Sequence, residues 1–169
     1  MKLFHISEHG NIDRFIPRKS KKMWGYKEYV WAISEKMLHN YLFPRGCPRI
    51  CVGNEVAASL SEWIAEEDAR DKKALIFISE NWLEKLLACV LYRYEFDDRH
   101  FKLIDSIAGY YVSEFTEIPI EVKEIKNCQE LLESMKVALI IKSKPELIAI
   151  KDRVIQATDF FSIIKWSNL

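Results

Sequence analysis

Glycine is scarce in this sequence, and the glycine-rich loops that bind phosphates are missing. Only 5 of the 169 residues are glycine, and none of them has the spacing of a dinucleotide-binding fingerprint or a P-loop. The signature motifs of α/β-hydrolases, zinc proteases and protein kinases are also absent. The sequence therefore excludes the Rossmann and P-loop classes of nucleotide-binding protein.

An excess of charge of one sign is lacking too, as is any long apolar run. Lys and Arg number 25, Asp and Glu number 25, and the formal net charge is zero. A balanced chain has no general attraction for nucleic acid or membranes, so we expect neither as a partner. No apolar run approaches the roughly 20 residues of a membrane span. The N-terminus lacks the basic region and apolar core of a signal peptide, which favours a cytoplasmic protein.

Cysteine is limited to four residues that form no recognisable metal site. In a chain without a secretion signal, they are expected to be reduced thiols. Cys47 and Cys51 have a CxxxC spacing, but a structural zinc site needs four ligands, which usually come as two close pairs. Cys89 and Cys128 are isolated and the histidines are scattered. We therefore expect no metal, and no partner spacing supports a cysteine nucleophile.

The residues that are plentiful predict a globular α+β protein. Apolar residues make up 49% of the chain and aromatic residues 12%, as in proteins that bury a core. The length favours a single domain over residues 1–169. The expected strands outnumber those of simple βαβ repetition, and several follow one another directly. We therefore expect mixed, largely antiparallel sheets with short flanking helices.

Alternating side chains identify two strands clearly. In residues 1–7, Phe4 and Ile6 share one face and His5 lies on the other. Residues 90–97 alternate in the same way, as in a half-exposed strand of an antiparallel sheet. The other expected strands are residues 30–33, 50–52, 74–78, 101–104, 109–113, 118–125, 137–141 and 160–166. The inward side chains of the strand at 118–125 are expected to be Ile118, Ile120 and Val122.

Capping signals predict the helices. Ser143 and Glu146 form a capping box with Pro145 in the first turn of a helix that is expected to run to about Gln156. Further helices are expected after the capping residues Ser34, Asn54, Ser79 and Asn127.

The segment between the first two strands is expected to be a long loop. Residues 11–15 could form one turn of helix. Residues 18–22 hold four cations, whose mutual repulsion favours an exposed, irregular conformation. A loop of this length often has a function of its own.

Three groups of residues could carry chemistry. His5 is either a proton donor or acceptor or a core histidine bonded to a backbone carbonyl, and the residues alone favour the core histidine. Arg45 and Arg49 stand on a stiff turn that contains two prolines, and they are the preferred contacts for an anion, with solvated surface as the alternative. Tyr110 belongs to aromatic pairs that mostly form sheet and core, with stacking on a base or nicotinamide as the alternative.

Several segments resemble an uncharacterised family of small bacterial proteins, a domain of unknown function. The resemblance covers nearly the whole chain and brings no established activity. Its segments are Leu3-Phe4-His5-Ile6-Ser7-Glu8, Val30-Trp31-Ala32-Ile33, Pro44-Arg45-Gly46-Cys47-Pro48-Arg49, Leu91-Tyr92-Arg93-Tyr94-Glu95-Phe96-Asp97, Ala108-Gly109-Tyr110-Tyr111-Val112-Ser113 and Phe161-Ser162-Ile163-Ile164.

A more distant resemblance is to the ADP-ribosyltransferase-like fold. The opening Leu-Phe-His-Ile-Ser is similar to its first core strand, in which a histidine contacts a ribose of NAD. Val30–Ile33 followed by Glu35–Tyr41 resembles the aromatic second strand and short helix of that fold. The acidic residue that opens a late strand in the fold is matched best by Glu117, with Glu114 as the second choice.

This resemblance implies an NAD-binding protein that transfers ADP-ribose or cleaves NAD. The implied roles are a ribose contact for His5, ring stacking for Trp31 or Tyr110, a phosphate contact for Arg45, and stabilisation of the positive charge on the ribose by Glu117. Such a site requires His5, Trp31 and Glu117 to share one cleft.

The sequence also departs from the pattern of that fold. Lys27-Glu28-Tyr29 stands where a glycine is usual, and Trp31 replaces the usual Tyr or Ser. Members of the fold that lack part of the triad often bind a ligand without transferring anything. The alternatives are therefore a non-enzymatic module that binds a small anion or a partner peptide, and an interaction protein whose exposed aromatic strand forms a homodimer.

Overall fold

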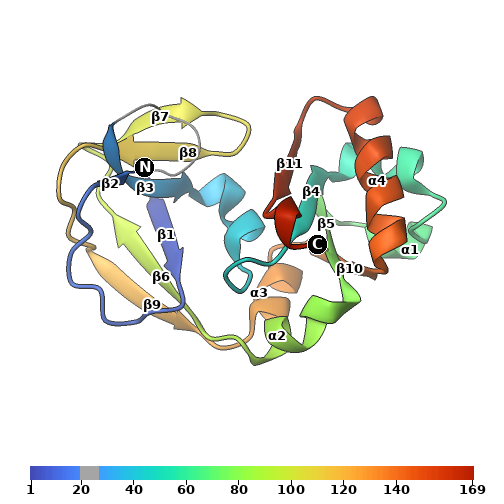
Figure 1. Ribbon diagram of the computed structural model, residues 1–169, viewed down its shortest axis with the longest axis horizontal. Coiled ribbons are helices and arrows are strands. Elements are labelled where there is room, and N and C mark those ends of the chain that lie inside the picture. Colours follow the sequence, from blue (N-terminus) through green and yellow to red (C-terminus); the bar gives the residue numbers. More distant parts are fainter. Residues whose placement is uncertain (20–26) are drawn as a thin grey trace. The chain divides into compact units, whose positions relative to one another are not determined.

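The computed structural model describes residues 1–19 and 27–169, which form two compact units (Figure 1). Unit 1 comprises Met1–Tyr41 and Val90–Ile125, and unit 2 comprises Leu42–Cys89 and Lys126–Leu169. Each unit has its own sheet, and almost all strand pairs are antiparallel. The predicted α+β class with short helices is confirmed, whereas the single domain stays a prediction.

Unit 1 is built on a seven-stranded sheet in which every pair of neighbouring strands is antiparallel. The strand order is β7-β8-β3-β1-β6-β9, and β2 pairs with β3. The opening strand β1 therefore lies inside the sheet, between β3 and β6. The elements are β1 Leu3–Ser7, β2 Arg18–Lys19, β3 Glu28–Ser34, the 3-10 helix η1 Glu35–Tyr41, β6 Leu91–Phe96, β7 Lys102–Asp105, β8 Tyr110–Ser113 and β9 Glu121–Ile125.

The register of the strands decides which side chains share a face of this sheet. His5 lies opposite Tyr94, and Val30 lies opposite Ser113. Because side chains alternate along a strand, Trp31 projects from the other face. The face that we call the His5 face carries Leu3, His5, Val30, Ala32, Tyr94, Phe96 and Ser113, and the opposite face carries Phe4, Trp31, Ile33, Arg93 and Tyr110.

The core of unit 1 lies on the His5 face and is largely aromatic. Tyr94 and Phe96 are buried there, and the ring of Phe15 packs against both, with centroids 5.0 Å apart in each case. The hydroxyl of Tyr94 donates to the carbonyl of His9 at 2.6 Å and accepts from the amide of Ile12. Each fully buried aromatic side chain contributes about 1.5–3 kcal/mol, so the segment that carries Phe15 is held over this face.

Unit 2 contains a four-stranded sheet in the order β10-β5-β4-β11, with β10 and β5 parallel. All six residues of β5 are buried, as expected for an apolar strand inside a sheet. The elements are β4 Arg49–Gly53, η2 Asn54–Leu60, α1 Glu66–Ala69, β5 Ala74–Ser79, η3 Glu80–Trp82, α2 Leu83–Ala88, α3 Cys128–Ser134, β10 Val137–Lys142, α4 Lys144–Ala157, β11 Phe161–Ile164 and η4 Trp166–Asn168.

Helix α4 begins as predicted. The capping box of Ser143 and Glu146 is present, and the stripe of Leu147, Ile150 and Val154 is buried against the sheet core of unit 2. Within the described part of the chain, no helix is long and apolar enough to cross a membrane.

Two local predictions in unit 1 are wrong. Residues 11–15 form no helical turn; instead, Phe15 makes a β-bridge with Glu117. The strand expected from residue 118 begins at Glu121, and its expected inward side chains Ile118, Ile120 and Val122 are 70%, 66% and 45% exposed. Phe15 pairs with Glu117 in place of forming a helical turn, and residues 118–120 are irregular, so β9 begins three residues later than expected. Of the cationic run at 18–22, residues 18–19 form the exposed strand β2 and the rest lie outside the described residues.

Candidate functional site

His5 is held in a defined orientation on the His5 face. Its Nδ1 lies 2.9 Å from the carbonyl oxygen of Trp31. A carbonyl only accepts, so the neutral ring carries its proton on Nδ1 and presents Nε2 as an acceptor. Burial lowers the pKa of His5 most, and the positive charge of Arg18 lowers it further, which favours the neutral ring. The ring is half-buried and still partly reachable.

Phe15 stands next to both residues predicted to be catalytic. Its ring centroid lies 4.9 Å from that of His5, with the planes tilted by 59°. Its main chain exchanges two hydrogen bonds with that of Glu117, at 2.8 and 2.9 Å. The structure therefore brings His5 and Glu117 to the same side of the sheet through one aromatic residue.

The carboxylate of Glu117 is buried and held by neighbours from two elements. The residue is 8% exposed, and its Oε1 accepts a hydrogen bond from Ser113 at 2.5 Å. The Nδ1 atom of His100 lies 3.3 Å from the same oxygen, and the His100 ring packs on Phe115 at 5.0 Å. A buried carboxylate requires such partners. Both contacts fall on Oε1, so the other oxygen is not used by these two residues.

Trp31 and Tyr110 lie on the face opposite His5 and pack against each other. Their ring centroids are 5.5 Å apart at 85°, and Tyr41 adds a third ring 5.7 Å from Tyr110. The hydroxyl of Tyr41 donates to the carbonyl of Ala108 at 3.3 Å. The structure therefore joins Trp31 to His5 only through a backbone carbonyl and does not bring their side chains together.

Glu114, the second choice for the acidic residue, is exposed rather than buried. Its carboxylate pairs with Lys27 at 3.0 Å, and this hydrogen bond raises the pKa of the Lys27 ammonium group. Of the two acidic residues, Glu117 is the one that adjoins the residues on the His5 face.

Arg45 and Arg49 belong to unit 2 and differ from each other. Arg49 is 5% exposed, donates from Nη1 to the carbonyl of Cys47 at 2.8 Å, and has its guanidinium 5.0 Å from the ring centre of Phe43. It is thus a structural part of the proline-containing turn. Arg45 is exposed.

The chain matches the family described as "Family of unknown function (DUF6886)" over residues 4–169. It belongs to this family. The match covers nearly the whole chain, in agreement with the resemblance inferred from its segments. Neither the curated proteins nor the solved structures provide a match.

Three residues near the DUF6886 candidate site were not predicted from sequence. Phe15 was assigned to a helical turn, although an aromatic residue in a polar loop is a usable signal for packing. Ser113 and Glu117 are four residues apart and meet because β8 ends between them. His100 lies in a charged loop, and nothing in its local sequence indicates a contact with Glu117.

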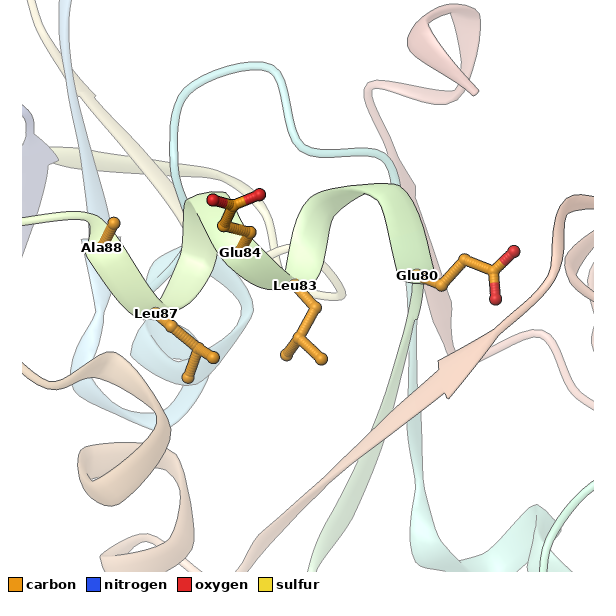
Figure 2. A pocket seen from close by; sticks show the side chains of 5 residues that line it. All are labelled: Glu80, Leu83, Glu84, Leu87 and Ala88. Atoms are coloured by element: carbon orange, nitrogen blue, oxygen red, sulfur yellow. The ribbon is translucent and has the colours of Figure 1, made fainter.

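Two further observations on the described residues concern possible metal ligands and a surface hollow. Among the described residues, no three His, Cys, Asp or Glu side chains are grouped so that they could hold a metal ion. Figure 2 shows a surface hollow of unit 2 along η3 and α2, where Leu83 and Leu87 point to one side of the helix. Its polar lining is limited to Glu80 and Glu84, and it contains none of the predicted site residues.

Proposed function

We propose that unit 1 binds NAD on the His5 face and cleaves the bond between nicotinamide and ribose, with water or another acceptor receiving the ADP-ribose. The observation that carries the proposal is that His5 and Glu117 both adjoin Phe15 on one side of the sheet. The ADP-ribosyltransferase-like resemblance assigns a ribose contact and a catalytic carboxylate to these same two positions.

His5 has the chemistry that a ribose hydroxyl requires. With Nδ1 engaged by the Trp31 carbonyl, Nε2 accepts a hydrogen bond from a hydroxyl group. The lowered pKa keeps the ring neutral near pH 7, so Nε2 remains an acceptor. Arg18 is close enough for its charge to act on His5, and it supplies a positive charge for a phosphate.

Glu117 has the chemistry that the breaking bond requires. As the C–N bond to nicotinamide breaks, its electron pair leaves with nicotinamide and positive charge develops on the ribose. A carboxylate beside that carbon stabilises the charge. Ser113 and the His100 ring hold the carboxylate in place through Oε1, and we assign its second oxygen to the ribose.

The proposal does not use Trp31 and Tyr110, because both side chains project from the opposite face. In their place, the ring of Phe15 supplies an aromatic surface beside His5. The phosphate contact of Arg45 or Arg49 stays a prediction. The burial of Arg49 argues against this role for Arg49.

The test combines ligand-induced thermal shift with release of nicotinamide. Millimolar NAD is expected to raise the melting temperature of the wild-type chain and of His9→Ala, a control that removes an exposed histidine near the same strand. His5→Ala is expected to abolish the shift. Glu117→Gln is expected to retain the shift and to lose nicotinamide release. Absence of any shift in the wild-type chain at millimolar NAD would contradict the proposal.

The second candidate is a non-enzymatic module that binds a small anion at His5 and Arg18, which is favoured by the charge of Arg18 near the ring. In that case ADP-ribose and pyrophosphate are expected to stabilise the protein as strongly as NAD. No nicotinamide would be released, and Glu117→Gln would leave binding unchanged.

A further inference from the structure

Two cysteines of unit 2 meet at the ends of two neighbouring helices. Cys89 follows α2 directly, and Cys128 is the first residue of α3, which lies beside α2 (Figure 1). Their sulfur atoms are 3.6 Å apart, although the residues are separated by 39 positions in the sequence. Cys89 also donates to the carbonyl of Leu86 at 3.2 Å. Neither sulfur takes part in a disulfide bond.

The other two cysteines provide an internal comparison. Cys47 and Cys51 are 0% and 3% exposed. Burial raises the pKa of Cys47 to about 11 and that of Cys51 to about 12, so their reactive thiolate forms are suppressed. Cys89 is half-buried, whereas Cys128 is 1% exposed, and the hydrogen bond with Cys89 and burial raise the pKa of the Cys128 thiol as well. The pair therefore differs from Cys47 and Cys51 in that a half-buried cysteine lies beside a buried one, with their sulfur atoms close together.

The two cysteines flank the second segment of unit 1 in the chain. Cys89 is the last residue before the chain enters the second segment of unit 1, and Cys128 follows closely after the chain leaves it. The enclosed segment holds β6, β7, β8 and β9, and its first and last paired residues are Leu91 and Ile125. A bond between the two sulfurs would close this segment into a covalent loop.

We propose that Cys89 and Cys128 are a site of reversible covalent modification, at which a low-molecular-weight disulfide such as glutathione disulfide converts the two thiols into an intramolecular disulfide. The sulfurs must approach by roughly 1.5 Å to reach bonding distance. The proposal is independent of NAD binding.

The exchange proceeds in two balanced steps. The thiolate of Cys89 attacks one sulfur of glutathione disulfide, which breaks the S–S bond, forms a mixed disulfide and releases one glutathione thiolate. Cys128 then loses its proton and attacks the Cys89 sulfur, which releases the second glutathione. The two protein thiols are oxidised by two electrons, and one glutathione disulfide is reduced to two glutathione molecules.

The exposure of the two sulfurs determines the order of these steps. Cys89 reacts first because it is the more exposed residue of the pair, and Cys128 is the resolving thiol because its sulfur lies 3.6 Å from that of Cys89. A dithiol reductant reverses the reaction by the same route.

The test treats the full-length, reduced chain with glutathione disulfide and maps its disulfides by mass spectrometry after alkylation and proteolysis. Free thiols are expected to fall from four to two, and one peptide pair is expected to link Cys89 to Cys128. The melting temperature is expected to rise by several degrees, because the cross-link restricts the unfolded chain. Hydrogen exchange in β6 and β9 is expected to slow. Dithiothreitol is expected to reverse all three effects.

Cysteine variants test whether the disulfide and the thermal shift depend on this pair or on the other two cysteines. Cys89→Ser is expected to lose the linked peptide and the thermal shift, whereas the double variant Cys47→Ser/Cys51→Ser is expected to retain both. Mapping of the wild-type chain decides the question even where a variant folds poorly. Persistent glutathione on Cys89, or four thiols that survive treatment, would overturn the proposal.

Discussion

The imidazole of His5 and the main-chain carbonyl of Trp31 form a hydrogen bond across two adjacent strands, with Nδ1 and oxygen 2.9 Å apart. This contact joins two residues whose side chains leave the sheet on opposite faces. The bond orients the His5 ring, while the indole of Trp31 packs with Tyr110 on the far side. A cleft lined by both side chains is therefore not formed, and Phe15 takes the place next to His5.

His5 is expected to make the stability of the protein depend on pH. Burial lowers its pKa below the unfolded value of about 6.5, so the unfolded chain binds more protons between the two values. The contribution of neutral His5 is present above about pH 6.5 and is lost as pH falls through the folded pKa. His5→Asn keeps an N–H donor for the Trp31 carbonyl but does not titrate.

The measurement is urea unfolding of the wild type and His5→Asn between about pH 7.5 and about pH 5. The free energy of unfolding of the wild type is expected to exceed that of His5→Asn by less as the pH falls. His9→Asn serves as the control and is expected to follow the wild-type curve. Parallel curves for the wild type and His5→Asn would show that His5 does not titrate differently in the folded state.

Ser113 and Glu117 are expected to be coupled energetically. Ser113→Ala removes a donor from a buried carboxylate, and a hydrogen bond to a charged group contributes about 1.5–3 kcal/mol. Glu117→Gln removes the charge that Ser113 and His100 stabilise. Because Ser113→Ala removes this contact and Glu117→Gln weakens it by removing the charge on the acceptor, the double variant is expected to lose about 1 kcal/mol less than the sum of the single variants. Additive effects in a urea-unfolding cycle would argue against a native Ser113–Glu117 bond.

Arg49 is expected to stabilise unit 2, in contrast to its neighbour Arg45. Arg49→Ala leaves the carbonyl of Cys47 unsatisfied and a gap beside Phe43, and an effect of about 3 kcal/mol is expected. Arg45→Ala removes an exposed side chain and is expected to change the free energy of unfolding by less than about 1 kcal/mol. Equal effects of the two variants in urea would contradict the structural role of Arg49.

Gly109 is expected to tolerate no side chain. Its φ is +69°, and an added Cβ would lie 2.6 Å from Cγ of Met37 and 2.7 Å from Oγ of Ser34. Gly109→Ala therefore combines an unfavourable backbone conformation with a steric clash, and about 1–3 kcal/mol of stability should be lost. At Gly53 the nearest atoms belong to the flexible Glu55 side chain, so Gly53→Ala is the milder comparison. A lower melting temperature for Gly53→Ala than for Gly109→Ala would contradict this prediction.

The signals that predicted structure correctly are carried by residues close together in the sequence. The alternation in residues 90–97 predicted the strand observed as β6, and the capping box at Ser143 and Glu146 predicted the start of α4. Both depend on local backbone geometry, which a short stretch of side chains specifies without help from the rest of the chain.

Local sequence patterns predicted the wrong structure at residues whose environment depends on segments far away in the chain. Ile118 and Ile120 have the alternation of an inward-facing strand, yet both are exposed and lie in the irregular segment between the Phe15–Glu117 bridge and β9. Phe15 lies in a polar loop, and its bridge to Glu117 joins segments about 100 residues apart. Contacts over such separations are decided by the packing of the whole unit.

The sequence by itself determined that this is an α+β protein that opens on a strand with His5 on one face. The resemblance to the ADP-ribosyltransferase-like fold added Glu117 as the predicted acidic residue, with Glu114 as the second choice. The tertiary structure alone decided the neighbours of that strand. With β1 between β3 and β6, the ring of His5 packs on Phe15, whose main chain pairs with Glu117, and it is separated from the ring of Trp31. The physical reason is that alternation assigns side chains to two faces, whereas strand order and register determine which residues share each face.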